Sequence, residues 1–281
     1  MNKFLPLAFA MLALSACGGG GDAGAGSTTT TTNDATVSSE GLWTGNLNST
    51  RTGAAHTATL IVLPTGEMRM IWNNCVQLVA TSTTANGYFN GTGNAYAPDG
   101  SNAACPASVT FPDATSLATL SVSGQVTAAS SLIGSYTAGG DTGTYNLTYS
   151  ALYARAGTLT RAAGTYSNGT LVLTIDAAGA ITGTSGTATI TGSLTTIDAT
   201  KNAYRIALVE TGSTAGTTTT STSTSTTSST STATSTTTAT TTTISVGGLA
   251  TLIDYGASSD NYLLISVTNS TSGFAVPLIR Q

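Results

Sequence analysis

Segments in which apolar and polar residues alternate, separated by turn residues, recur through most of this chain. Residues 170–175 (TLVLTI) are followed by Asp-Ala-Ala-Gly and then by residues 180–184 (AITGT). A period of two is typical of strands with one buried face, and Gly179 suits the positive φ that a tight turn requires. No stretch shows the repeat of a long amphipathic helix. The sequence therefore predicts an all-β protein built from antiparallel hairpins.

The second half of the chain, residues 161–281, offers about eight such segments. They begin with GTYS at residues 164–167 and end with FAVPLIR at residues 274–280. A sheet of eight antiparallel strands that closes on itself has no exposed edge strands, which otherwise invite aggregation. We therefore expect this half to form a small β-barrel or sandwich.

The first half, residues 40–160, resembles a looser copy of the second. GLWTGNLNS opens it as GTYSNG opens the second half, and residues 144–161 resemble residues 261–280. With 281 residues, the chain is long enough for one or two domains that each bury a core. We predict two tandem β units, residues 40–160 and 161–281.

Two low-complexity tracts interrupt the alternating pattern. Residues 17–39 are rich in Gly and Thr, and residues 211–243 are almost entirely Ser and Thr without a charge. Such compositions bury too little apolar area to offset the entropy lost on ordering. The first tract is predicted to be a flexible tether and the second a disordered insertion between two strands of the second unit. The insertion is either a neutral repeat expansion or an exposed, glycosylated stalk.

Residues 1–17 have the layout of an export signal. Lys3 supplies a basic region, residues 4–14 are apolar, and small residues precede Cys17. Residues 14–17, Leu-Ser-Ala-Cys, resemble the lipobox of bacterial lipoproteins. This resemblance implies removal of the signal peptide, residues 1–16, diacylation of the Cys17 thiol and acylation of the new amino terminus. The alternative is a plain secretory leader that contains a cysteine.

The same resemblance places the chain on a membrane. Each buried methylene of an acyl chain contributes about 0.8 kcal/mol, so two or three chains at Cys17 form a stable anchor. Gly18 follows Cys17 where an acidic residue would favour the inner membrane, so the family pattern implies the outer membrane, facing the periplasm or the cell surface. No other apolar run approaches about 18 residues, and we expect the anchor to be lipid alone.

Charged residues are sparse. They make up 7% of the chain, against roughly 25% in ordinary soluble domains. Without Lys3, seven basic and twelve acidic residues remain, and the basic ones are scattered. Because nucleic-acid binding requires clustered Lys and Arg, we expect no nucleic-acid partner.

A Gly-x-Trp-x-Gly motif, formed by Gly41, Trp43 and Gly45, opens the first unit. With the hairpins that follow it, the motif is similar to the barrel lobes of transferrin-binding-protein-like surface lipoproteins and to small calycin barrels such as lipocalins and avidins. Residues 164–186 and 260–280 also resemble proteobacterial outer-membrane lipoproteins of uncharacterised function. These resemblances imply β-barrels. They transfer no ligand-binding residue to this chain, because nothing beyond the Gly and Trp positions matches.

Two cysteines remain once Cys17 is lipidated. Cys75 and Cys105 form an even pair in an oxidising compartment, and joining them would close a loop of about 30 residues and stabilise the fold by about 3 kcal/mol. We predict this disulfide, with two free thiols as the alternative. We expect no metal and no other cofactor, because His56 is the only histidine and no Cys-x-x-Cys occurs.

Catalytic motifs are sparse. A Ser/His/Asp triad would have to use His56, and no Gly-x-Ser-x-Gly accompanies it. Asp176, Asp198 and Asp254 stand at predicted strand ends, where Asp favours turns; a catalytic carboxylate pair is the alternative. We therefore expect a protein that is not an enzyme.

Two functions fit these expectations. In the first, the chain is a binding module that takes a small ligand or a partner protein through a barrel and its loops. In the second, it is a structural or assembly lipoprotein of the outer membrane. A ligand-sized cavity of about 300 Å³ or more inside a barrel would favour the first function, and a solidly packed core the second. Trp43 and Trp72 are expected to pack in a core. The alternatives are that Trp43 plugs a barrel end or stacks on a ligand, and that Trp72 faces a cavity.

Overall fold

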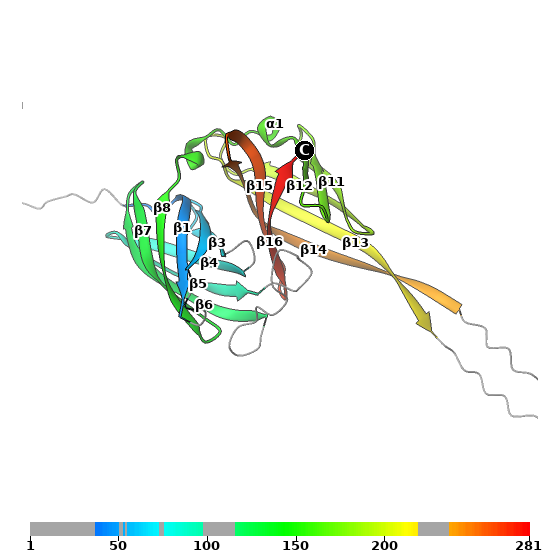
Figure 1. Ribbon diagram of the computed structural model, residues 1–281, viewed down its shortest axis with the longest axis horizontal. Helices are drawn as coiled ribbons and strands as arrows, with labels where there is room; N and C mark the ends of the chain where they lie inside the picture. The colour runs from blue at the N-terminus through cyan, green and yellow to red at the C-terminus, as the bar shows by residue number, and fades with distance from the viewer. Residues whose placement is uncertain (1–36, 51–52, 54, 73–75, 98–115, 219–235) are drawn as a thin grey trace, which may run out of the picture. The chain divides into compact units, whose positions relative to one another are not determined.

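The computed structural model describes residues 37–50, 53, 55–72, 76–97, 116–218 and 236–281 (Figure 1). Cys17, Cys75 and Cys105 lie outside these ranges, so the lipid anchor and the disulfide stay predictions. Of the predicted tether, residues 17–39, only residues 37–39 are described. Within the described ranges, no helix has the length and apolar character needed to cross a membrane.

The first unit is a closed barrel of eight antiparallel strands, here called barrel 1. Each strand pairs with the next along the chain, and the last pairs with the first from Trp43↔Tyr149 to Ser49↔Gly143. The strands are β1 (Gly41–Ser49), β2 (Ala55–Val62), β3 (Glu67–Trp72), β4 (Val76–Ala85), β5 (Tyr88–Tyr96), β6 (Leu117–Thr127), β7 (Ser131–Ala138) and β8 (Asp141–Tyr149).

The second unit, barrel 2, repeats this topology. Its strands are β9 (Gly164–Ser167), β10 (Leu171–Ile175), β11 (Ala180–Ser185), β12 (Ala188–Thr196), β13 (Tyr204–Thr218), β14 (Thr236–Tyr255), β15 (Ser258–Thr268) and β16 (Gly273–Arg280). Barrel 2 closes where β16 pairs with β9, at Ile279↔Ser167 and Arg280↔Tyr166. The predicted all-β fold of two tandem antiparallel units is confirmed, and each unit is a closed barrel.

A short connection joins the barrels. It contains a 3-10 helix, η1 (Ala151–Ala154), and a single-turn α-helix, α1 (Leu159–Ala162). Thr158 caps α1, because its hydroxyl oxygen accepts a hydrogen bond from the backbone N–H of Arg161 at 3.3 Å. The predicted boundary between residues 160 and 161 falls inside α1.

The interior of each barrel contains a core of inward-facing side chains. Along β8, Asp141, Gly143, Tyr145 and Leu147 are buried while the residues between them are exposed, as the period of two predicts. Trp43 and Trp72 both lie in the core of barrel 1, which confirms the packing prediction for them. Other large side chains in the two cores are Met68, Met70, Phe89, Tyr136, Val122 and Leu132 in barrel 1 and Tyr166, Leu173, Tyr204, Ile206, Leu263 and Leu278 in barrel 2.

Barrel 1 begins with a glycine and a tryptophan that its last strand covers. Gly41 has a φ of 156°, which is accessible essentially only to glycine, and a Cβ atom there would lie 2.7 Å from the ring of Tyr149. The Trp43 ring meets the Tyr149 ring edge-on, with 5.3 Å between centroids. Trp43 Nε1 donates a hydrogen bond to the carbonyl oxygen of Ser39 at 2.9 Å. Trp43 thereby connects the segment before β1 with β8, the strand that closes barrel 1.

Barrel 2 begins in the same way with different side chains. Gly164 has a φ of 152°, and Tyr166 takes the place of the tryptophan. The Tyr166 hydroxyl donates to the carbonyl oxygen of Ala162 at 2.8 Å, again four residues back. The Arg280 guanidinium lies over the Tyr166 ring, 5.2 Å from its centroid. The sequence likeness between GLW and GTY therefore corresponds to equivalent positions in two barrels.

Outward-facing apolar residues join the two barrels. The first cluster contains Leu42, Ile61 and Leu63 of barrel 1 with Ala203 and Leu249 of barrel 2, and the second contains Ile71 with Leu264 and Ala275. These strands are buried on both faces. This explains why residues 60–63, Leu-Ile-Val-Leu, form a continuous apolar run instead of alternating.

Arg69 provides a buried charged contact between the barrels. Its side chain is on β3 and is 8% exposed. Its Nη1 donates to the carbonyl oxygen of Ser266 at 3.3 Å, and its Nη2 donates to that of Gly247 at 3.4 Å. Glu67 lies 3.6 Å from Arg69 Nε and accepts a hydrogen bond from Arg205 of barrel 2 at 2.8 Å. One buried guanidinium thus holds backbone carbonyls of two strands of barrel 2.

Arg69→Met is expected to lower the free energy of unfolding by about 2 kcal/mol, because it leaves buried carbonyl oxygens without their donor. Urea denaturation followed by circular dichroism would measure the loss. Arg205→Met is the matched control: the Arg205 side chain is 52% exposed, and removing an exposed ion pair should cost less than about 1 kcal/mol. Equal losses in the two variants would contradict this role for Arg69.

The prediction of disorder across residues 211–243 is wrong at both ends of that tract. β13 continues to Thr218 and β14 begins at Thr236, and the two pair without a register shift from Tyr204↔Ala250 to Thr218↔Thr236. β-branched threonine favours strands, and the ladder of barrel 2 supplies a hairpin that these residues extend. Residues 219–235 lie outside the described part.

Candidate functional site

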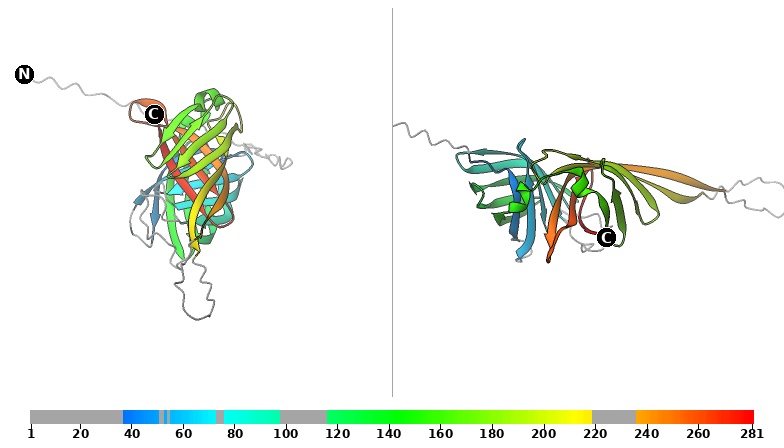
Figure 2. Two further views of the ribbon diagram at one scale, coloured as in Figure 1. Left: turned by 90° about the vertical axis from the view of Figure 1, so that its right-hand side faces the viewer. Right: turned by 90° about the horizontal axis from the view of Figure 1, so that it is seen from above.

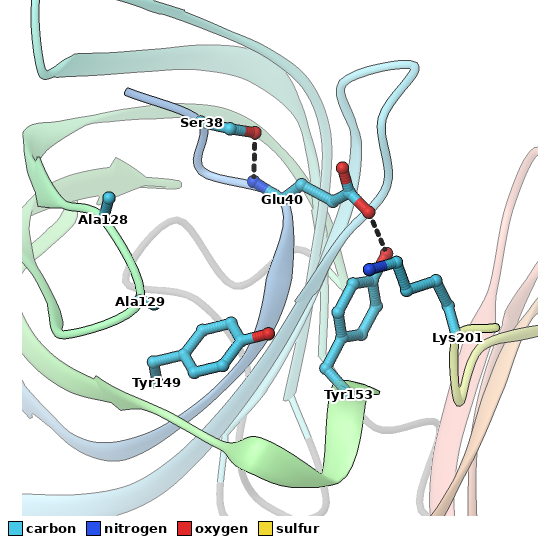
Figure 3. Close-up of a pocket in the computed structure, with 7 residues that line it drawn as sticks. All are labelled: Ser38, Glu40, Ala128, Ala129, Tyr149, Tyr153 and Lys201. Atoms are coloured by element: carbon cyan, nitrogen blue, oxygen red, sulfur yellow. Dashed lines mark hydrogen bonds between the residues drawn. The ribbon is translucent and has the colours of Figure 1, made fainter. Parts of the chain in front are cut away.

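A cavity of about 300 Å³ opens at the rim of barrel 1 (Figure 3). We call it the rim cleft, and none of its lining residues belongs to the buried core clusters of the two barrel interiors. Its lining residues come from five separate places in the chain and include neither a histidine nor a cysteine. They are Ser38, Glu40, Ala128, Ala129, Tyr149, Tyr153 and Lys201.

Both barrels and their connection contribute to the rim cleft. Glu40 directly precedes β1, and Tyr149 ends β8, so the strand pair that closes barrel 1 supplies one wall. Ala128 and Ala129 form the β6–β7 turn, where their small side chains leave the space open. Lys201 reaches the cleft from the connection between β12 and β13.

Tyr153 organises the charged groups of the cleft. Its hydroxyl donates to Glu40 Oε1 at 3.0 Å, and Lys201 Nζ lies 5.5 Å from the centroid of its ring. Burial, together with the negative charge of Glu40, raises the pKa of Tyr153 well above its ordinary value. Tyr153 therefore stays a neutral donor that orients the Glu40 carboxylate.

The cleft offers complementary hydrogen-bonding chemistry. Glu40 retains acceptor capacity beyond its bond to Tyr153, Lys201 carries an ammonium group with three donors, and the Tyr149 hydroxyl can donate or accept. The Tyr149 and Tyr153 rings add apolar faces (Figure 3). This arrangement suits a small polar group that carries both a donor and an acceptor.

The structure places His56 away from the rim cleft. Its ring lies on β2, 5.0 Å from the Trp72 ring. In barrel 1, Asp141 accepts hydrogen bonds from the Ser49 hydroxyl at 2.9 and 3.0 Å and from the Tyr136 hydroxyl at 2.8 Å. The serine thus donates directly to the carboxylate, whereas a catalytic triad places the histidine between the two. This arrangement is a buried polar network.

Two of the three aspartates at predicted strand ends, Asp176 and Asp198, serve local structure. Asp176 accepts from the backbone N–H groups of Ala178 and Ala180, at 2.8 and 2.9 Å, as a turn aspartate does. Asp198 accepts from the backbone N–H of Thr200 at 2.7 Å, which lowers the pKa of Asp198.

Asp254 belongs instead to an ion-pair cluster. Arg155 donates to both of its carboxylate oxygens, at 2.7 and 2.5 Å, and also reaches Asp260 at 3.2 Å. The hydrogen bond from Arg155 is the main cause that lowers the pKa of Asp254. Arg161 also binds Asp260. Because Arg155 and Arg161 belong to the connection between the barrels, the cluster attaches that connection to the β14–β15 hairpin.

Metal ligands do not gather in the described part of the chain, where no group of three or more His, Cys, Asp or Glu side chains could hold an ion. The predicted site residues Cys17, Cys75 and Cys105 cannot be placed, since they lie outside that part.

Sequence reasoning missed the rim cleft altogether. Glu40 and Tyr153 lie 113 residues apart, and no motif connects them. Sequence reasoning did not single out Asp141 either, although Asp141 directly follows the two glycines between β7 and β8, and aspartate is common next to such turns.

Comparison of this chain with protein-family models, with curated proteins and with solved structures found no match.

Proposed function

We propose that this chain is a lipid-anchored, non-enzymatic binding protein of the outer membrane that takes its ligand in the rim cleft. The proposal is carried by the convergence of Glu40, Tyr149 and Lys201 on an open cavity of about 300 Å³. Small-molecule sites begin at about this volume. The ligand is a polar group with both a donor and an acceptor, either on a free small molecule or on a partner protein.

The packing of the barrels supports a site on their outside. Fully buried side chains such as Trp43 and Leu60 in barrel 1 and Leu173 and Leu263 in barrel 2 occupy the interiors. An apolar ligand in a lumen would have to displace these side chains, and each displaced side chain costs about 2 kcal/mol or more. A ligand at the rim displaces none of them.

The same packed cores favour a second candidate function, a structural or assembly lipoprotein whose barrels serve as rigid bodies. In that case the rim cleft would have no ligand, and the barrel surfaces would contact other envelope components. The two candidates differ in one measurable respect, the occupancy of the rim cleft.

Lys201 makes this difference accessible to experiment, because no other lysine follows residue 3. Reductive methylation with 13C-labelled formaldehyde keeps its charge and places an NMR probe in the rim cleft. The probes to be added are free amino acids and monosaccharides, which carry donors and acceptors together. At least one is expected to shift the Lys201 methyl signal in a saturable manner. Tyr149→Phe, which removes one hydroxyl from the cleft, should weaken this binding about tenfold.

Tyr88→Phe is the matched control, since Tyr88 is exposed and does not line the rim cleft. It should leave the affinity unchanged. If no probe moves the Lys201 signal and an amine-reactive cross-linker at Lys201 captures no neighbour on intact cells, the structural function replaces the binding function. Binding of the apolar dye N-phenyl-1-naphthylamine inside a barrel would also contradict the proposal.

The anchor is tested separately from the site. Cells fed labelled palmitate should incorporate it into the wild-type chain and not into the Cys17→Ala variant. Equal labelling of both would remove the lipid anchor from the proposal and leave the binding site to be judged on the Lys201 experiment.

A further inference from the structure

The rim cleft contains one carboxylate and one ammonium group that do not neutralise each other. Glu40 and Lys201 both line it, yet no ion pair joins them in the described part of the chain. Lys201 Nζ lies instead over the Tyr153 ring, 5.5 Å from its centroid, and the Glu40 carboxylate accepts a hydrogen bond from the Tyr153 hydroxyl at 3.0 Å. Both charges therefore keep the capacity to bind a further group.

The backbone that carries Lys201 is fixed from barrel 2. The next residue, Asn202, is fully buried, and its side chain donates to the carbonyl oxygen of Leu252 at 2.6 Å and accepts from the N–H of Leu252 at 3.1 Å. The backbone N–H of Asn202 also donates to the carbonyl oxygen of Tyr153 at 2.9 Å. Because Lys201 is held beside Tyr153 in this way, a ligand has to order only its side chain.

The backbone that carries Glu40 is fixed from barrel 1. The preceding residue, Ser39, accepts hydrogen bonds from Trp43 Nε1 at 2.9 Å and from the Thr84 hydroxyl at 2.7 Å. Glu40 and Lys201 thus come from two separately anchored segments. The connection with η1, which supplies Tyr153, runs between the two barrels (Figures 1 and 2).

The balance of charge in the rim cleft selects one class of ligand. An anion would be repelled by Glu40 and a cation by Lys201, and a neutral ligand would displace water from both charges without replacing it by an ionic partner. A ligand with both charges makes two charge-assisted hydrogen bonds, which are about twice as strong as neutral ones. Lys201 also acts electrostatically on Asp198, but Asp198 does not line the cleft and its Oδ1 binds Thr200.

We propose that the ligand of the rim cleft is a zwitterion that carries a primary ammonium group and a carboxylate or phosphate. Its ammonium group binds the Glu40 carboxylate, and its acid group binds the ammonium group of Lys201. This inference rests on the proposed function, because it names the ligand class of that site. Free amino acids and the ethanolamine phosphate headgroup of membrane lipids both have this chemistry.

The test compares four small molecules of similar size that differ in charge. Glycine has both charges, glycinamide only the ammonium group, acetate only the carboxylate, and glycolamide neither. Ligand-observed NMR titrations with the full-length chain in detergent would give their affinities. Glycine is expected to bind at least about tenfold more tightly than the other three. Glycerophosphoethanolamine represents the lipid headgroup, and whether it or glycine binds more tightly identifies the source of the zwitterion.

Variants that remove one charge should change the preference of the rim cleft, an effect that misfolding would not produce. Glu40→Gln keeps an acceptor for Tyr153 and should bind acetate as tightly as glycine. Lys201→Met should bind glycinamide as tightly as glycine. Each variant should bind glycine about tenfold more weakly than the wild type. The matched control, Glu210→Gln, removes a carboxylate from β13 outside the cleft and should keep the wild-type preference.

The outcomes separate this inference from the proposed function. If glycolamide binds as tightly as glycine, or if both charge-removing variants keep the wild-type preference, the ligand is not a zwitterion, although the rim cleft stays a ligand site. Binding of a monosaccharide alone would have the same meaning. If none of these compounds binds and the methyl signal of Lys201 responds to no probe, both the zwitterion and the binding function are wrong.

Discussion

Replacing Trp43 with alanine is expected to lower the free energy of unfolding by about 4 kcal/mol, the largest effect of a single substitution that we predict. Trp43 is fully buried in the core of barrel 1, and its ring packs edge-on against Tyr149 of the closing strand. Its removal leaves a cavity where β1 meets β8. It also leaves the carbonyl oxygen of Ser39 without the indole donor.

Urea denaturation followed by circular dichroism and by fluorescence of the remaining tryptophan, Trp72, would measure this loss. Tyr88→Ala is the matched control, because it removes an aromatic ring that is 57% exposed and should cost less than about 1 kcal/mol. A loss below about 2 kcal/mol for Trp43→Ala would show that the start of barrel 1 can collapse around the cavity, and that this tryptophan does not hold the barrel closed.

Alkaline pH is expected to unfold the protein cooperatively, with stability falling from about pH 10 upward. Five buried tyrosines have a raised pKa, in each case chiefly because burial disfavours the phenolate: Tyr136, Tyr145, Tyr153, Tyr166 and Tyr204. Burial raises the pKa of Tyr204 from 10.0 to about 12, which corresponds to about 3 kcal/mol. The folded protein thus binds more protons than the unfolded chain above pH 10, so stability is complete below that pH and is lost as the pH rises toward 12 and beyond.

The tyrosinate absorbance of the buried tyrosines should therefore appear together with the loss of the circular dichroism signal in an alkaline titration, in addition to the absorbance of the exposed tyrosines, because the buried hydroxyls ionise only on unfolding. Tyr204→Phe removes one of these groups and should move the alkaline midpoint to higher pH. Tyr88→Phe, at an exposed position, should leave the midpoint where it is. Ionisation of the buried tyrosines without loss of the β-sheet signal would mean that water reaches the cores.

Much of the fold could be predicted because strand pairing follows local patterns. The period of two at residues 170–175 and 180–184 corresponds to β10 and β11, and Gly179 in the turn has a φ of 87°. Eight segments after residue 161 correspond to eight strands of barrel 2. Each hairpin needs only neighbouring residues, so its signals lie within a short stretch of sequence.

At the two ends of the 211–243 tract, the composition of the sequence led to a wrong prediction of disorder. Low apolar content predicted disorder there, yet the tract begins and ends on strands that barrel 2 already holds in register. Once a hairpin is started by the barrel, each further threonine pair adds hydrogen bonds at a small entropic cost. Composition alone does not show that barrel 2 already holds the two ends of the tract side by side.

The rim cleft and the contact between the barrels required the tertiary structure. Glu40, Tyr149 and Lys201 belong to three distant segments, and Arg69 finds its carbonyl partners nearly 200 residues away. Alternation shows that a strand has one buried face, but it does not show what lies against the other face. The continuous run at residues 60–63 was the one local sign that a second surface covers barrel 1.

The sequence by itself determined that this chain is all-β, that it divides near residue 161 and that its second half forms about eight antiparallel strands, because turn chemistry and side-chain periodicity act over a few residues. The tertiary structure alone decided which outer faces meet, which polar groups converge at the rim cleft and how far β13 and β14 extend. Those outcomes depend on the closure of two barrels, which brings together residues that no local pattern relates.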